Sequence, residues 1–450
     1  MASEFDVIVI GVGMAGLNIA RRTRSAGKSV AVIDEMPYGG TCMLRGCDPK
    51  KVLVGAAEFI DWQRRMQGNG IAGEAHIDWG ELMQFKRTFT DSPPKMLEKN
   101  LSKNGVATHY GTAQFIDTNT IQVGDETLIG KNIVIATGAK PMTLGISGEE
   151  LMATSTDFLE METLPERIVF VGGGYIAFEF AHIAARAGAQ VTILEMMPRS
   201  LPAFDPDLVD LLIEATKEVG IDVQFETRVS EVIKEASGAF TVKVSSPNGS
   251  QSFSADLVVH GAGRVPAVEG LQLEKAGVEY TRRGIVVNEY LQSVSNPAVY
   301  AAGDVAATDG IPLTPVAVTE GIVVANNILN GNQRTADYIG TPSVVFTIPA
   351  LARVGLTEAE ANEQGLKFTV NHQQTSSWYS ARRTNEKHTA FKILIEEGTE
   401  HILGAHLLGA HAGEVINMFV LAIRHNLTAS DLKRTIYVHP AESSDISYML

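Results

Sequence analysis

The stretch that decides the fold is Asp6-Val7-Ile8-Val9-Ile10-Gly11-Val12-Gly13-Met14-Ala15-Gly16, a short apolar run followed by three closely spaced glycines. The run predicts a buried strand, and the residues after it predict a helix that ends near Ala26. A second strand over Ser29–Ile33 leads directly to Asp34. Glycines at this spacing let the backbone approach a pyrophosphate at a helix start, and the acid accepts hydrogen bonds from a ribose. The stretch therefore predicts a dinucleotide-binding βαβ unit.

The same pattern recurs later in the chain at a constant offset of 161 residues. The offset relates Gly11 to Gly172 and Asp34 to Glu195, with Gly174 in the second turn. One offset that aligns glycines, turn and acid indicates an internal repeat. Two dinucleotide units in one chain predict two different nucleotides.

A second feature of the sequence is its cysteines. The chain has two, Cys42 and Cys47, and both lie in the segment Gly39–Lys51. A disulfide-stabilised extracellular protein would need more cysteines in a shorter chain. A zinc site needs two further Cys or His ligands at similar spacing, and none lies within twenty residues. We therefore favour a redox pair over a metal pair; the alternative is two small residues packed beside a helix.

The length, charge and hydrophobic segments of the chain argue against a nucleic-acid-binding, secreted or membrane protein. The 450 residues predict two to four domains. The formal charge of −15, from 37 basic and 52 acidic side chains, argues against a nucleic-acid partner. The N-terminal apolar run is too short for a signal peptide, and no window approaches the length of a membrane span. We expect a soluble, cytoplasmic protein with no membrane partner.

The rest of the chain predicts further helices and strands. Helices are expected over Phe59–Gly68 and over Gly80–Asn100, with a break at Pro93-Pro94. Short strands are expected over Val106–Val134, a meander over Val223–Val259, and a buried strand that ends at Asp304. From about Ala336 the pattern changes to an antiparallel sheet and two helices. The expected elements of this last region are Ser343–Thr347, Lys367–Gln374, Thr389–Glu396, His401–Leu408, Glu414–Asn426 and Ala429–Thr435.

These residues together resemble the flavoprotein disulfide reductases, the family that holds glutathione reductase, dihydrolipoamide dehydrogenase and mercuric reductase. The resemblance covers the whole chain in the family's order. Its motifs are Gly11–Gly16, Gly39–Cys47, Ala136-Thr137-Gly138, Gly172–Glu179, Gly263–Pro266, Ala302–Asp304, Leu313–Val316, Val354–Thr357 and His439-Pro440.

The resemblance implies an α/β fold with two Rossmann-like dinucleotide-binding domains and a C-terminal α+β dimerisation domain. Residues 1–150 and 266–335 would form the FAD-binding domain, 151–265 the NAD(P)-binding domain, and 336–450 the dimerisation domain. The protein would be a homodimeric enzyme with a shared active site. It would be an NADH-preferring disulfide oxidoreductase that passes electrons through FAD and the Cys42–Cys47 redox disulfide to a small disulfide or dithiol.

The resemblance also implies roles for the catalytic residues. Tyr175 would cover the flavin until the nicotinamide displaces it. Glu179 would pair with Lys51, whose ammonium would stabilise negative charge on the reduced flavin. Cys47 would lie against the flavin, and Cys42 would attack the substrate disulfide. A helix start and Lys51 nearby would lower the thiol pKa. Arg45 could act likewise or face solvent.

The final catalytic group implied by the family is a histidine from the partner subunit's tail. His439, before Pro440, would be the acid–base group for Cys42. An isolated monomer would then lack a complete site.

The cofactor-binding positions carry over from the same motifs. Those expected to bind FAD or NAD are Gly11, Gly13, Gly16, Asp34, Gly40, Thr41, Thr137, Gly138, Gly172, Gly174, Glu195, Arg264, Gly303, Asp304 and Thr314. Glu195 would accept hydrogen bonds from the adenosine ribose and repel a 2′-phosphate, which favours NAD over NADP. Arg199 would soften that preference. No metal site is expected.

Several positions depart from the family pattern. The carboxylate expected five residues after His439 is replaced by Ser444, and either Asp445 or Glu442 could substitute for it. Ile322 stands where glutathione reductases carry an arginine, and the tail lacks the cysteine pair of mercuric reductases. Other functions therefore stay open as alternatives. The protein could have dihydrolipoamide dehydrogenase-like activity, or it could be an NAD(P)H:quinone or oxygen oxidoreductase, a transhydrogenase, or a redox-sensing or scaffold flavoprotein.

Overall fold

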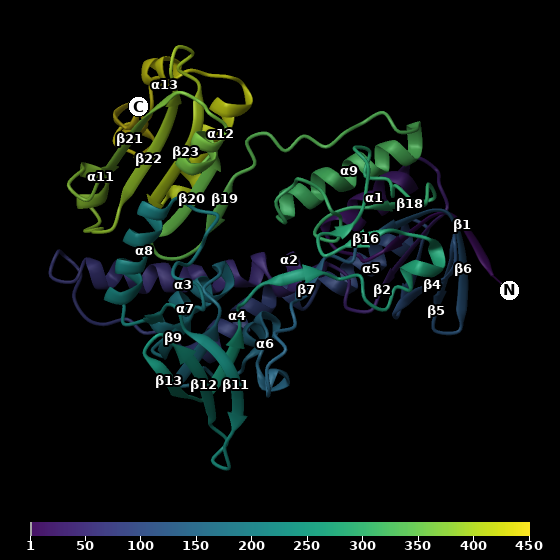
Figure 1. Ribbon diagram of the computed structural model, residues 1–450, viewed down its shortest axis with the longest axis horizontal. Helices are drawn as coiled ribbons and strands as arrows, with labels where there is room; N and C mark the ends of the chain where they lie inside the picture. Colours follow the sequence, from purple (N-terminus) through teal and green to yellow (C-terminus); the bar gives the residue numbers. More distant parts are fainter. Residues whose placement is uncertain (1) are drawn as a thin grey trace. The chain divides into compact units, whose positions relative to one another are not determined.

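The computed structural model describes residues 2–450, and the chain forms two compact units. The first unit consists of the residues up to Pro49 together with Phe85–Met142 and Gly263–Tyr338. The second consists of Lys50–Gln84, Thr143–Ala262 and Ile339–Leu450. Figure 1 shows both units, coloured along the sequence. Each unit is therefore assembled from segments that are far apart in the chain.

The first unit contains a seven-stranded sheet in the order β3-β2-β1-β6-β5-β4, with β18 paired to β6. Strands β1, β2, β3, β6 and β18 run parallel to one another, and β5 pairs antiparallel with both β6 and β4. The strand bounds are β1 Ser3–Ile10, β2 Val30–Asp34, β3 Val106–Tyr110, β4 Ala113–Asp117, β5 Thr120–Val123, β6 Glu126–Ile135 and β18 Val299–Ala301. The strand–helix–strand unit predicted at the N-terminus is confirmed.

Both faces of this sheet are covered, which explains the unbroken apolar run of β1. Successive side chains of a strand point to opposite faces. Val7 and Val9 pack with the core beneath helix α1 (Met14–Ser25), and Ile8 and Ile10 pack into a separate core on the other face. Helix α9 (Thr314–Asn330) packs against α1. A parallel sheet buried on both sides requires this kind of sequence.

The second unit repeats the arrangement with a parallel sheet in the order β10-β9-β8-β14. Helices α7 and α8 lie in the core on one face, and the antiparallel strands β11, β12 and β13 cover the other. The segment predicted as a single meander therefore divides between the two sheets. The bounds are α7 Tyr175–Arg186, α8 Pro206–Glu218, β8 Arg167–Val171, β9 Gln190–Leu194, β10 Asp222–Gln224, β11 Arg228–Lys234, β12 Phe240–Ser246, β13 Gly249–Ala255 and β14 Leu257–His260.

The C-terminal part of the second unit is a five-stranded antiparallel sheet in the order β19-β20-β23-β22-β21. Helix α12 lies against β20 and β23 (Figure 1). Strand β20 was missed in the sequence analysis, because its short run between Pro349 and Gly355 resembles a connecting loop until strands pair on both sides. The bounds are β19 Ser343–Val345, β20 Ala350–Gly355, β21 Phe368–Gln374, β22 Ala390–Glu396, β23 Ile402–Gly409, α12 Ala412–Arg424 and α13 Ala429–Arg434.

The helices between the two repeats lie where the sequence predicts them, with one difference. The break at Pro93 separates α4 (Trp79–Thr90) from α5 (Pro93–Lys103). Helix α3 (Cys47–Arg65) begins well before the predicted Phe59, directly after α2 (Gly40–Arg45). The remaining elements are β7 Ala139–Pro141, β15 Arg264–Pro266, β16 Tyr280–Thr281, β17 Gly284–Ile285, α6 Ser155–Glu160, α10 Glu358–Glu363, α11 Tyr379–Arg382, α14 Ile446–Met449, η1 Glu149–Leu151, η2 Leu273–Ala276 and η3 Glu442–Asp445.

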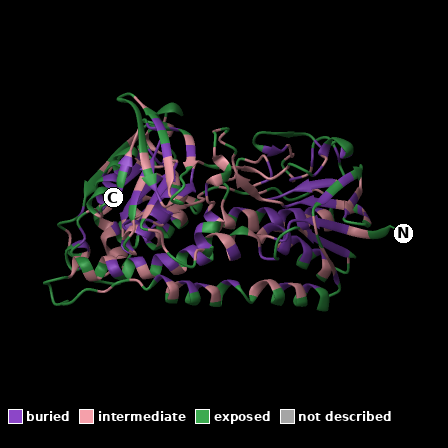
Figure 2. Ribbon diagram, turned by 90° about the horizontal axis from the view of Figure 1, so that it is seen from below, coloured by how far each residue is buried: buried purple, intermediate pink, exposed green. Residues whose placement is uncertain are grey.

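Burial follows these elements in each unit. Figure 2 shows buried positions along the strands and mixed burial along the helices. Within residues 2–450, the structure shows no helix that is both long and apolar enough to cross a bilayer.

Candidate active site

The two cysteines lie on either side of a junction between two helices. Cys42 is in the first turn of α2 and is half-buried, whereas Cys47 begins α3 and is exposed. No disulfide joins them. The Cys47 Sγ lies 3.5 Å from the Oγ1 of Thr314, the first residue of α9. The structure therefore brings two thiols and one hydroxyl together in the first unit.

The surroundings of Cys42 raise the pKa of its thiol, whereas the sequence analysis predicted that the pKa would be lowered. The interaction with Cys47 and burial both raise the pKa of the Cys42 thiol, and the hydrogen bond with Thr314 only partly opposes them. The predicted lowering of the thiol pKa is therefore wrong for Cys42. Two adjacent thiols disfavour a second negative charge, and burial disfavours the first. Cys42 needs a base before it can act as a nucleophile.

The first glycine motif forms a cradle at the carboxyl ends of adjacent parallel strands. Gly11 has a φ of +99°, and a Cβ there would lie 2.3 Å from the Ala136 carbonyl oxygen. A Cβ on Gly40 would lie 2.5 Å from the Cα of Gly13, so the loop before α2 closes directly over the turn before α1. Only glycines allow these approaches. The space above the turn fits a dinucleotide pyrophosphate.

Charged residues surround this cradle. The Asp34 carboxylate accepts hydrogen bonds from the Val12 N–H at 2.7 Å and the Met36 N–H at 2.9 Å. Burial raises the pKa of Asp34 and of Asp304, and the positive charges of Arg45 and Arg264 respectively oppose the shift. Arg45 is half-buried and interacts electrostatically with Asp34 and Arg264. The donor set suits the ribose hydroxyls and phosphates of a bound dinucleotide.

The residues predicted to bind nucleotides divide between the two units. Those in the first unit are Gly11, Gly13, Gly16, Asp34, Gly40, Thr41, Thr137, Gly138, Arg264, Gly303, Asp304 and Thr314; those in the second are Gly172, Gly174 and Glu195. Two of the first set hold neighbouring loops, since Thr137 Oγ1 donates to the Ala267 carbonyl at 2.7 Å and the Gly303 N–H donates to Glu320 at 2.6 Å.

The second glycine motif repeats the hydrogen bonds of the first. The Glu195 carboxylate accepts from the Gly173 N–H at 2.5 Å and from the Met197 N–H at 2.6 Å. These donors stand 161 residues after Val12 and Met36, so the offset found in the sequence also relates individual hydrogen bonds. The second turn therefore has the same capacity to hold a ribose as the first.

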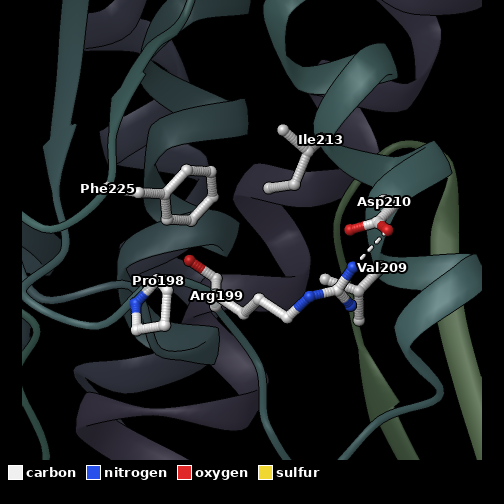
Figure 3. A pocket seen from close by; sticks show the side chains of 7 residues that line it. Pro198, Arg199, Val209, Asp210, Ile213 and Phe225 are labelled. Atoms are coloured by element: carbon white, nitrogen blue, oxygen red, sulfur yellow. Dashed lines mark hydrogen bonds and ion pairs between the residues drawn. The ribbon is translucent and has the colours of Figure 1, made fainter.

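A pocket of about 280 Å³ lies beside this second turn. Figure 3 shows Arg199 directed along the pocket to Asp210 on α8, with which its guanidinium forms an ion pair. The pocket lining is Pro198, Arg199, Ser200, Val209, Asp210, Ile213 and Phe225. The pairing with Asp210 was missed in the sequence analysis, because nothing local relates an acid on a later helix to this loop.

The predicted pair between Lys51 and Glu179 is wrong. Glu179 is buried on α7, and its carboxylate accepts from the Lys50 Nζ at 2.9 Å and from the Phe346 N–H at 2.8 Å. Lys51 lies about 100° further round α3 and instead pairs with Glu58, at 3.1 Å and in solvent. Lys50 lies one helical turn after Cys47 on α3. Tyr175 begins α7, one turn before Glu179, and its side chain is half exposed.

The tail presents His439 on the surface. His439 is exposed, and its Nδ1 lies 3.5 Å from the Ser444 Oγ. Neither predicted carboxylate bonds it within the described residues. Asp445 accepts a hydrogen bond from Ser380, and the Glu442 carboxylate lies 3.6 Å from His411 Nε2.

Among residues 2–450, no group of three or more His, Cys, Asp or Glu side chains is arranged to hold a metal ion. The first unit thus holds a dithiol and a dinucleotide turn, and the second holds another dinucleotide turn, a buried Lys–Glu pair and an exposed imidazole. A dithiol in the same unit as a dinucleotide turn suits the transfer of electron pairs to a disulfide.

Comparisons with known proteins agree with this geometry. Residues 5–321 match the family described as pyridine nucleotide-disulphide oxidoreductase, and residues 341–449 match its dimerisation domain. The chain is 32% identical to a glutathione reductase of Nostoc sp., with all of both chains covered. It is 31% identical to a dihydrolipoyl dehydrogenase of Haloferax volcanii, over 98% of this chain and 94% of that protein. Among solved structures, the HOCl-induced flavoprotein disulfide reductase RclA from Escherichia coli matches with a TM-score of 0.88 and 29% identity, over 99% of both chains.

Proposed function

Since this chain belongs to the pyridine nucleotide-disulphide oxidoreductase family, we propose that it carries electron pairs from NADH through FAD and the Cys42/Cys47 pair to a small disulfide. The resemblance and the fold class expected from the sequence are confirmed. The protein is an enzyme of an FAD-dependent family that uses NAD(P)H, and it carries that family's dimerisation domain. The observation that carries the finer proposal is the contact of both thiols with each other and with Thr314.

In the proposed arrangement FAD occupies the cradle of the first unit and NADH the turn of the second. The FAD-binding domain comprises residues 1–150 and 266–335, the NAD(P)-binding domain 151–265, and the dimerisation domain 336–450. Asp34 and Asp304 would accept hydrogen bonds from FAD hydroxyls, and Arg45 and Arg264 would offset the pyrophosphate charge. Bound in this cradle, FAD would supply the capacity to take up a hydride from NADH and to pass the electron pair to the Cys42–Cys47 disulfide. By the family resemblance, Tyr175 would cover the flavin until nicotinamide binds.

The thiols then carry out two exchange steps. The Cys42 thiolate attacks one sulfur of the substrate disulfide, which breaks the substrate S–S bond and releases one product thiol. The Cys47 thiolate attacks Cys42 in the mixed disulfide, which restores the Cys42–Cys47 disulfide and releases the second thiol. One dithiol is oxidised for each disulfide reduced.

His439 of the partner subunit supplies the base for the first step. The raised pKa of Cys42 supports the need for such a base, and the exposure of His439 on the tail supports its availability to a second copy. The imidazole takes the Cys42 proton and returns it to the departing thiol. The complete site then requires the homodimer.

Lys50, in place of Lys51, is assigned to the flavin. Its position one turn after Cys47 supports this, as does the buried pairing with Glu179, which holds the ammonium in one orientation. A positive charge there stabilises negative charge that develops on reduction.

The preference for NADH over NADPH is supported by two carboxylates. Glu195 accepts a hydrogen bond from the Gly173 N–H in the second turn, and its negative charge there would repel a ribose 2′-phosphate. Arg199, the nearby cation, is already paired with Asp210. A 2′-phosphate therefore meets a net negative site.

A Cys42→Ser variant tests the proposal. We expect loss of turnover with glutathione disulfide and lipoamide, while NADH-to-dye electron transfer continues, because the dye needs no exchange thiol. Retained disulfide turnover would reject Cys42 as the attacking group. The absence of the family's carboxylate at position 444 motivates quinones or oxygen as an alternative acceptor, and faster steady-state turnover with quinones than with any disulfide would establish that alternative.

A further inference from the structure

The C-terminal tail contacts the His439 ring through a hydroxyl. Ser444 Oγ lies 3.5 Å from His439 Nδ1 and donates a hydrogen bond of 2.5 Å to the Ala441 carbonyl oxygen. A serine hydroxyl has a single hydrogen and two acceptor lone pairs. Because that hydrogen is committed to Ala441, the oxygen can only accept from the imidazole. An Nδ1–H of His439 can therefore donate to this oxygen, whereas an unprotonated Nδ1 would find no hydrogen there.

Backbone hydrogen bonds hold the turn that contains Ser444. The Ser444 N–H donates to the Ala441 carbonyl at 2.9 Å, and the Ala441 N–H approaches Ser444 Oγ at 3.4 Å. Ser444 is half-buried at this turn, whereas His439 is exposed. The position of the Ser444 hydroxyl is thus set by its hydrogen bonds to the backbone, independently of the His439 ring.

The two carboxylates of the tail, Asp445 and Glu442, interact with residues other than His439. Asp445 accepts from Ser380 on α11, and Glu442 lies beside His411 at the start of α12. Burial raises the pKa of Glu442, and the positive charges of His411 and Arg383 oppose that shift. None of these groups bonds His439 in the described part of the chain.

We propose that Ser444 is the positioning residue for His439: its Oγ accepts the Nδ1 hydrogen and leaves Nε2 as the basic atom presented to Cys42 of the partner subunit. The inference rests on the function proposed above. Ser444 itself, and neither Glu442 nor Asp445, then takes over the orienting role of the carboxylate that the family carries at this position.

A hydroxyl orients the ring differently from a carboxylate. A carboxylate fixes the tautomer and also stabilises the imidazolium, because it supplies a full negative charge. A hydroxyl fixes the tautomer alone. The ring then gives up its acquired proton more readily, which suits the return of that proton to a departing thiol.

The test measures how fast iodoacetamide alkylates Cys42 in the dithiothreitol-reduced, FAD-loaded dimer, read by mass spectrometry of the Cys42 peptide. This measurement needs no knowledge of the acceptor. We expect Ser444→Ala to slow alkylation about fivefold at neutral pH, the size of one ordinary hydrogen bond. Ser444→Thr keeps the hydroxyl and should retain the rate. Asp445→Asn and Glu442→Gln should change it less than about twofold.

A double variant separates positioning from general damage. In a His439→Gln background, Ser444→Ala should have no further effect, because its role acts through the imidazole. A further loss there overturns the proposal, as does an unchanged rate in Ser444→Ala or a larger loss in Asp445→Asn. If His439→Gln alone leaves the rate unchanged, the assignment of His439 as the base fails, which is a separate result.

The pH dependence of alkylation supplies a readout that a merely structural residue would not alter. A Ser444→Asp variant places a negative charge beside the ring, so the acid limb of its profile should move to higher pH by about one unit. Histidine-selective ¹⁵N NMR of the unmodified dimer should show His439 with hydrogen on Nδ1. An unmoved limb together with hydrogen on Nε2 would refute the inference, and dimer mass by light scattering checks that each variant assembles.

Discussion

Replacing Lys50 by methionine should destabilise the second unit by about 3–5 kcal/mol, whereas the same change at Lys51 should cost less than about 1 kcal/mol. The two lysines are adjacent in α3, so the pair of variants is matched in chemistry and in helix position. The structure and the sequence resemblance disagree about which lysine pairs with Glu179, and this comparison decides between them.

The difference in magnitude comes from burial. The Lys50 and Glu179 side chains are 11% and 4% exposed, and their charged atoms are 2.9 Å apart. Without the ammonium, the Glu179 carboxylate keeps the Phe346 N–H as its donor in the structure and loses its counter-charge. Removing one member of a buried pair leaves an uncompensated charge. Lys51 and Glu58 are both 48% exposed, where water screens the pair.

Amide hydrogen exchange of the α7 peptides measures this loss locally. A protein of this size need not unfold in one step, so a global midpoint is a poor measure. A loss of 3 kcal/mol corresponds to at least about 100-fold faster exchange through opening. A Lys50→Met/Glu179→Leu double variant should recover most of the protection, because replacing both charges by apolar groups removes the unpaired carboxylate.

Reduction of the flavin by NADH, followed by stopped flow, gives the functional counterpart. If Lys50 supplies the charge beside the flavin, Lys50→Met should slow reduction by about 100-fold and Lys51→Met should leave it nearly unchanged. A larger effect of Lys51→Met on both exchange and reduction would refute the pairing seen in the structure.

Three further changes have defined outcomes. Asp210→Asn should raise the NADPH-to-NADH ratio of kcat/KM by about three- to tenfold, because it frees Arg199 for a 2′-phosphate, and an unchanged ratio would remove Asp210 from nucleotide selection. Burial raises the pKa of Glu386 from 4.5 to about 7, so its protonated form stabilises the fold below pH 4.5 and this stabilisation is lost as pH rises to 7. Glu386→Gln should therefore flatten the pH dependence of local stability, measured by amide hydrogen exchange of the peptide that contains residue 386 after correction for the intrinsic rate at each pH, and add up to about 3 kcal/mol at pH 8. A variant that follows the wild-type pH curve would contradict this. Lys392→Met should cost about 3–5 kcal/mol in local stability, measured by amide hydrogen exchange of the β22 peptides, because the buried Nζ lies 2.8 Å from Asp205, while the exposed control Lys387→Met should cost under about 1 kcal/mol.

The sequence alone determined the strand–turn–helix–strand unit at the centre of each parallel sheet, because glycine spacing, strand hydrophobicity and a terminal acid are local properties. The turns at Gly11 and Gly172 and the acids Asp34 and Glu195 each depend on a stretch of about thirty residues. The 161-residue offset between the two units also relates their hydrogen bonds, since Asp34 and Glu195 accept from backbone amides at equivalent positions. The order of motifs along the whole chain was enough to identify the family.

Only the tertiary structure decided which of several adjacent residues makes each long-range contact. Lys50 and Lys51 differ by one position, and the choice between them depends on where α7 brings Glu179, 129 residues further along the chain. The sequence offered Glu442 and Asp445 as partners of His439, yet the turn at Ala441 directs Ser444 there and packing engages both acids elsewhere. The rise in the pKa of Cys42 likewise depends on its distance from Cys47 and Thr314. Such contacts are set by the path of the backbone in three dimensions, and neither residue type nor spacing encodes that path locally.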